Sequence, residues 1–210
     1  MPPRLSSISN DLPRSSALPS LNEIMRGTYA AWRIALRDPQ AVTWLDDTIP
    51  GVWKSFSAAV LVAPYYALAT WQQLADPSSV HAPLPIIIMV ESICYVLGWL
   101  IFPLLVHHFC VLTQRENLFP RFLAALNWSA LVQMIVLLPL VLLDTAQIMT
   151  PDWQSAIYLA IGLLLYIYLG MIIRDTLELT AAGIVGLVIC CILVDAALLA
   201  VAQNILGIQS

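Results

Sequence analysis

The segment AAGIVGLVICCILVDAALLAVAQN, residues 181–204, decides the fold class of this chain. It is a nearly unbroken apolar run in which Asp195 is the one charged side chain. A helix needs about 20 such residues to cross a hydrocarbon core about 30 Å thick. The whole chain has the same character, since 60% of its 210 residues are hydrophobic and 10% are charged. Soluble domains carry about 25% charged residues, so the sequence predicts an all-α polytopic membrane protein.

Five segments of this kind predict five transmembrane helices within residues 52–205. Pro64, Pro103 and Pro139 fall inside three of them. Membrane helices tolerate proline where neighbouring groups satisfy the freed carbonyls, so these residues do not argue against the spans. The predicted spans are residues 53–74, 84–111, 123–147, 154–173 and 181–204.

The chain before the first span divides into a tail and a helix. Residues 1–19 are rich in proline and serine and are predicted to form a disordered cytoplasmic tail. Ser20 and Glu23 have the S-x-x-E spacing of a capping box, in which each side chain bonds the other residue's backbone N–H. This box opens a helix, and we expect Pro39 to end it after Asp38.

Residues 20–51 are predicted to form this helix and a linker to the membrane domain. The helix is amphipathic, and two arrangements remain open for it. It lies in the cytoplasmic membrane interface, with Tyr29 and Trp32 near the headgroups, or it packs on the protein's own helix ends. The apolar stripe that recurs at helical spacing consists of Leu21, Ile24, Met25, Thr28, Trp32, Ala35 and Leu36.

The basic residues predict the orientation in the membrane. Of the nine Lys and Arg residues, six precede or enter the first span, two lie between the second and third, and one lies between the fourth and fifth. Cytoplasmic loops carry the excess of Lys and Arg, which places the N-terminus in the cytoplasm and Ser210 outside. Four tryptophans fall near the predicted interfaces, as in an aromatic belt: Trp53, Trp71, Trp128 and Trp153.

Three carboxylates lie within the predicted spans, where ionisable groups are costly and mark functional sites by default. At 1.5 Å per residue, Glu91, Asp144 and Asp195 lie about 10, 6 and 13 Å below the outer surface. No Lys or Arg falls in that half of the membrane. One interpretation is a shared proton or cation site, with Tyr95 and Gln133 on the same helix faces. The other is that each carboxyl is separately hydrogen-bonded and fixes helix packing.

The last span also carries a row of small residues, Ala182, Gly186 and Cys190, suited to close helix contact. The sequence has no nucleotide-binding loop, nucleophile elbow or zinc-protease signature, and no Cys/His spacing typical of a metal site. We therefore expect neither an enzyme, nor a cofactor, nor a metal centre. The net charge of −4 gives no reason to expect binding to nucleic acid.

The five-span layout behind a long cytoplasmic N-terminal region resembles the Yip family of membrane proteins and its bacterial relatives. The resemblance covers about residues 33–204. It is carried by Arg37-Asp38-Pro39 before the membrane, by ENLFPRFL (116–123) leading into a proline-bearing third span, and by RDTLELT (174–180) before the last span. It implies a bacterial inner membrane as the location.

These features predict a non-enzymatic membrane protein that acts as a scaffold or accessory subunit through helix–helix contacts. Its partners would be the lipid bilayer and either further copies of itself or other membrane proteins. The alternative is a small transporter or permease component that uses the outer-half carboxylates to bind protons or cations. The two differ in whether those carboxylates converge.

Overall fold

The computed structural model describes residues 18–73, 82–148 and 150–207. The predicted tail therefore lies outside the described residues, apart from Leu18 and Pro19. The all-helical prediction is confirmed, because the described residues contain helices and no strand. In chain order the elements are α1 (Leu21–Ala35), η1 (Ala41–Trp44), α2 (Ile49–Ser55), α3 (Ser57–Gln73), α4 (Leu84–Leu112), η2 (Glu116–Leu118), α5 (Phe119–Thr145), α6 (Pro151–Leu177) and α7 (Ala181–Leu206).

Four helices among the described residues, α4 to α7, are long and apolar enough to cross a membrane. The segment predicted as the first span is divided between α2 and α3, and α3 is 17 residues long. Helices α5 and α6 begin four and three residues before the predicted spans. Pro120 and Pro151 lie in their first turns, where a missing N–H costs nothing, so the helices extend through them.

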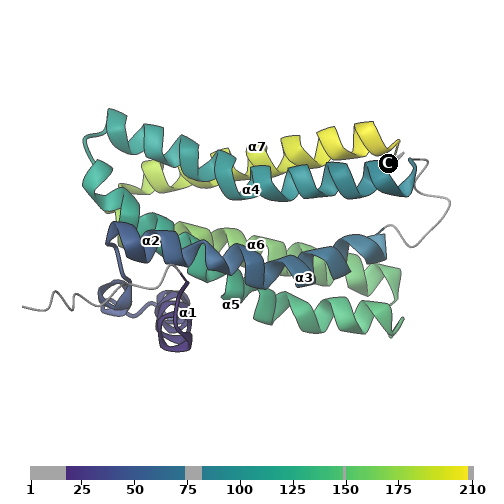
Figure 1. Cartoon of the computed structure of the whole chain (residues 1–210), viewed down its shortest axis with the longest axis horizontal. Helices are drawn as coiled ribbons and strands as arrows, with labels where there is room; N and C mark the ends of the chain where they lie inside the picture. The colour runs from purple at the N-terminus through teal and green to yellow at the C-terminus, as the bar shows by residue number, and fades with distance from the viewer. Residues whose placement is uncertain (1–17, 74–81, 149, 208–210) are drawn as a thin grey trace, which may run out of the picture.

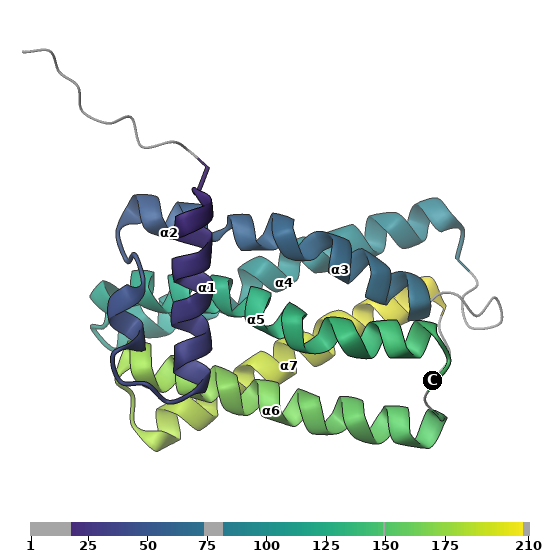
Figure 2. The same ribbon diagram turned by 90° about the horizontal axis from the view of Figure 1, so that it is seen from below.

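The long helices form two layers (Figure 1). Helices α4 and α7 pack against each other in one layer, and α3, α5 and α6 form the other. The described Lys and Arg residues all belong to elements at one end of the bundle, here called the basic end. This end holds α1, the α4–α5 turn and the α6–α7 turn, and the opposite end is called the far end (Figure 2).

The two layers are joined at the basic end. Most of the buried core lies there, including Phe102 and Val106 of α4 and Ile172 of α6. Arg115, beside the α4–α5 turn, donates hydrogen bonds to the carbonyl oxygens of Leu177 and Glu178 at 2.7 and 2.8 Å. These carbonyls end α6 and lack partners within their own helix, so the arginine caps α6 and ties the two turns together.

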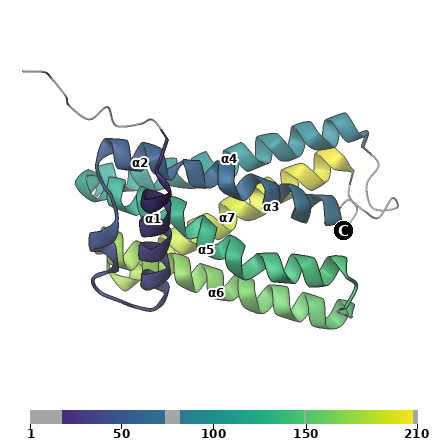
Figure 3. The same ribbon diagram turned by 60° about the horizontal axis from the view of Figure 1, so that its bottom comes forward.

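Helix α1 crosses α5 and α6 instead of running alongside the long helices (Figures 2 and 3). Its contact face is built from small residues, so the backbones approach closely. Gly27 lies directly against the indole of Trp128, and the hydroxyl of Tyr168 on α6 donates to the Ala31 carbonyl oxygen at 2.7 Å. Trp128 is 4% exposed, so the prediction that it belongs to an aromatic belt is wrong. Instead, α1 packs directly against the Trp128 ring.

The opposite face of α1 is apolar and exposed. Leu21, Met25, Trp32 and Leu36 recur on that side, and Leu21 is 77% exposed. The helix thus uses its small residues to pack on the bundle and leaves its large apolar side chains outside. The two arrangements left open by the sequence are compatible, because they use different faces of the helix.

The capping box of α1 is confirmed, since both reciprocal Ser20–Glu23 hydrogen bonds are present. The predicted C-terminus is wrong by three residues, because α1 ends at Ala35 rather than after Asp38. Arg37 has φ 60°, and its N–H donates to the Ile34 carbonyl oxygen at 2.9 Å. The Asp38 N–H donates to the carbonyl oxygen of residue 33 at 3.0 Å, which completes a Schellman motif.

Candidate functional site

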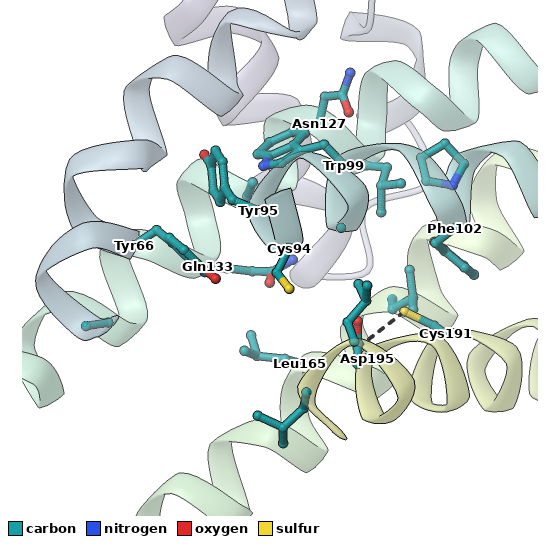
Figure 4. A pocket seen from close by; sticks show the side chains of 18 of the residues that line it. Tyr66, Cys94, Tyr95, Trp99, Phe102, Asn127, Gln133, Leu165, Cys191 and Asp195 are labelled. Carbon is teal, nitrogen blue, oxygen red and sulfur yellow. Dashed lines mark hydrogen bonds between the residues drawn. The ribbon is translucent and has the colours of Figure 1, made fainter. Parts of the chain in front are cut away.

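A cavity of about 590 Å³ lies between the two layers of helices. Helices α3 to α7 all contribute to its wall, and the surrounding side chains include aromatic, carboxyl and amide groups (Figure 4). Small residues such as Ala69, Gly98, Ala130 and Ala202 help to leave the space open. Its volume is in the range of ligand-binding pockets, about 300–1,000 Å³.

Glu91 of α4 lies in the wall of this cavity and connects the two layers. The Tyr66 hydroxyl on α3 donates to Glu91 Oε2 at 2.8 Å. One turn further along α4, the Tyr95 hydroxyl donates to the Ala59 carbonyl oxygen of α3. The rings of Tyr66 and Tyr95, with centroids 4.7 Å apart and planes inclined by 43°, line this side of the cavity. A carboxylate has about four acceptor positions, so one tyrosine donor leaves Glu91 with unused capacity.

Asp195 of α7 repeats this arrangement on the other side of the cavity. The Tyr166 hydroxyl on α6 donates to Asp195 Oδ2 at 3.0 Å. The Cys191 thiol, one turn away on α7, lies 3.7 Å from the same oxygen. Both carboxyls therefore belong to the α4–α7 layer, and both receive a tyrosine hydroxyl from the opposite layer.

Asn127 of α5 lies in the wall toward the basic end and is 1% exposed. Its Nδ2 donates to Ser55 Oγ at 2.8 Å, and Ser55 in turn donates to the Val52 carbonyl oxygen. Because the Ser55 proton is already used, the amide orientation is fixed with the nitrogen toward Ser55. Asn127 Oδ1 is left buried without a hydrogen-bond partner. Such an atom costs about 1–3 kcal/mol, so it calls for a ligand or a water.

The cavity is rich in acceptors and contains no side-chain cation. None of the described residues around it is Lys or Arg. Besides the two carboxyls, it offers the rings of Tyr66, Tyr95 and Trp99. The negative faces of aromatic rings attract cations, as carboxylates do. This arrangement suits a positively charged or hydrogen-donating occupant.

The structure brings together four of the five residues that the sequence grouped as a candidate site. Glu91, Tyr95, Gln133 and Asp195 all line the cavity. Asp144 does not, because it lies near the far end of α5 and accepts a hydrogen bond from Gln154 at 2.6 Å. Asp144 therefore fits the alternative interpretation, in which a carboxyl is satisfied locally.

Sequence reasoning missed the residues that reach the site from other helices. Tyr66 and Tyr166 lie in apolar runs with no nearby charge to mark them, and Asn127 was not singled out from the sequence. Spacing along one helix cannot pair residues on two helices, so the tyrosine partners had no signal in the sequence.

The predicted helix-contact face lies on the outside of the bundle. Ala182 and Gly186 are exposed, and Cys190 is half-buried. A Cβ atom added to Gly186 would have no heavy atom within 4 Å. At Gly186, therefore, the row has no close neighbour among the described residues.

Among the described residues, no group of three or more His, Cys, Asp or Glu side chains is arranged to hold a metal ion. Comparisons with protein-family models, with curated proteins and with solved structures found no match.

Proposed function

We propose that this chain is a small transporter or permease component that binds protons or cations in its intramembrane cavity. The observation that carries the proposal is the pair of carboxyls, Glu91 and Asp195, in one cavity whose wall has no Lys or Arg. Each is held by a tyrosine from the opposite layer of helices. Charged groups inside a membrane are expensive, so an unpaired carboxyl there must take up either a proton or a cation.

The proposal includes five membrane crossings with the N-terminus in the cytoplasm of a bacterial inner membrane. The four long apolar helices support the larger part of it. Residues 49–73, which form α2 and α3, cover about 37 Å at 1.5 Å per residue and run beside the long helices (Figure 1). The basic end would then be the cytoplasmic end, in agreement with the positive-inside rule. The resemblance to the Yip family stays a prediction from the sequence.

The test is proton and potassium flux in liposomes that contain the purified protein. We expect flux in the wild type and its loss in both Glu91→Gln and Asp195→Asn. The matched control is Asp144→Asn, which removes an equivalent charge outside the cavity and should leave flux unchanged. Absence of flux in folded wild-type protein, or equal loss in the Asp144 control, would count against transport through this cavity.

A scaffold or accessory subunit is the second candidate function. It is favoured by the exposed row of Ala182 and Gly186, which is free to contact another helix. Gly186→Leu adds a side chain on the outside of the bundle, where a Cβ atom meets no heavy atom within 4 Å. The substitution should therefore leave folding intact while disrupting association. Crosslinking or native mass spectrometry in mild detergent measures this, and an oligomer unchanged by the substitution would argue against the scaffold.

A further inference from the structure

We propose that the occupant of the cavity is an organic ammonium ion, with its charged nitrogen between the carboxyls and the aromatic rings. The inference rests on the proposed cation-binding function and names its substrate class. Three features of the cavity carry it: its size, its aromatic wall and its apolar remainder.

The size of the cavity exceeds what a bare ion needs. A water molecule occupies about 30 Å³ in the liquid, whereas this cavity is about 590 Å³. A proton or an alkali ion would leave most of that space to water. A molecule with a hydrocarbon part fills it and brings no further charge into the membrane.

The aromatic wall is suited to an ammonium group. Tyr66, Tyr95 and Trp99 follow one another along one side, with successive ring centroids 4.7 and 6.2 Å apart. Aromatic rings bind alkylated ammonium groups through their negative faces, and the interaction is stronger where water is excluded. The Tyr66 hydroxyl donates a hydrogen bond to Glu91, so the carboxylate lies beside this aromatic wall.

The remaining wall of the cavity includes several leucine side chains. Leu165, Leu169, Leu198 and Leu199 offer apolar contacts to a hydrocarbon part. The cavity thus suits an amphiphilic amine or quaternary ammonium better than a simple inorganic ion.

Calorimetric titration of the full chain in zwitterionic lipid nanodiscs tests this. The probes are benzyltrimethylammonium, potassium at equal ionic strength, and benzyl alcohol as a neutral aromatic compound. We expect saturable binding of the ammonium at least about tenfold tighter than either of the other probes, which corresponds to about 1.4 kcal/mol. Equal affinity for potassium or for benzyl alcohol would overturn the inference.

Two matched pairs of variants locate the binding. Glu91→Gln should weaken ammonium binding about tenfold or more, while Asp144→Asn should not change it. Trp99→Leu should weaken it between about twofold and thirtyfold, the range of a cation–π contact, while Trp71→Leu, at an exposed tryptophan outside the cavity, should not. Trp99→Phe keeps an aromatic face and should lose less, which preserves the test if Trp99→Leu does not fold. An unchanged affinity in Trp99→Leu would refute the aromatic site.

The binding and flux experiments separate the two proposals. Carboxylate-dependent flux of protons or potassium without ammonium binding would overturn the substrate class and leave the transport function standing. Saturable ammonium binding that depends on Glu91 and Trp99, without flux of protons, potassium or the ammonium probe itself, would support the site and overturn transport.

Discussion

The contact between Gly27 and Trp128 gives a prediction whose size follows from the structure. A Cβ atom built on Gly27 would lie 2.5 Å from the indole Nε1 and 2.6 Å from two ring carbons. Carbon atoms pack at about 3.5–4.0 Å, so α1 or the ring must move by about 1 Å. The ring is buried and cannot turn away, and overpacking of this kind costs about 1–3 kcal/mol.

Gly27→Ala also gains about 1 kcal/mol of helix propensity, which leaves a net loss of about 0–2 kcal/mol in the docking of α1. The assay is hydrogen–deuterium exchange of α1 backbone amides, which reports the free energy of local opening. We expect faster exchange in α1 and no change at the far end of α4. Gly27→Val, with two more methyl groups against the same ring, should show a larger effect.

The matched control is Gly186→Ala, which adds the same methyl group where no heavy atom lies within 4 Å. That variant should gain the propensity without the clash and be as stable as the wild type or more so. If α1 exchange were unchanged in both Gly27 variants, or if Gly186→Ala affected α1 equally, the close packing of α1 on α5 would be refuted.

Three further predictions concern charge and hydrogen bonding. The Lys54 ammonium, with smaller help from Ser20, lowers the pKa of Glu23 to about 2. The folded value lies below the unfolded value of about 4.3, so this stabilisation of α1 is present above about pH 4.3. It should be lost as the pH falls toward 2, as measured by amide exchange in α1, and constant exchange over that window would contradict it. Arg115→Met leaves two C-terminal carbonyls of α6 uncapped and should destabilise the fold by about 1.5–3 kcal/mol in thermal unfolding, which an unchanged Tm would contradict. Asn127→Leu loses a hydrogen bond but removes a buried orphan oxygen, so we expect a stability change within about 1 kcal/mol; a loss above about 3 kcal/mol would show that Oδ1 is satisfied in solution.

Hydropathy predicted the long helices well, because a span must satisfy every backbone group within itself and be apolar throughout. Because the helices are apolar on all sides, the sequence did not indicate which face of each helix points into the bundle. In a soluble bundle the polar face marks the outside, but here Leu198 at the cavity and Leu193 at the surface are chemically alike. The convergence of Glu91 and Asp195 therefore could not be deduced from the sequence, although both could be nominated.

Helix ends were predicted less well than helix existence. Arg37, Gln114 and Gln147 all adopt the left-handed conformation just after a helix, with φ of 60°, 58° and 52°. Glycine usually marks such positions, and its absence removed the signal. Gly207, with φ 68°, does end α7 in this way, whereas Gly27 is needed for close approach rather than for backbone freedom.

The hydrogen bonds of Arg115 join the α4–α5 and α6–α7 turns at the basic end, so a tilt of the α4–α7 layer would pivot about this point. Helix α4 has 29 residues and therefore extends about 43 Å from this pivot. A tilt of about 5° about this pivot displaces its far tip by about 4 Å, and displaces Glu91 and Asp195 by about 3 and 2 Å at their smaller radii. Such a tilt would therefore stretch the Tyr66–Glu91 hydrogen bond more than the Tyr166–Asp195 hydrogen bond.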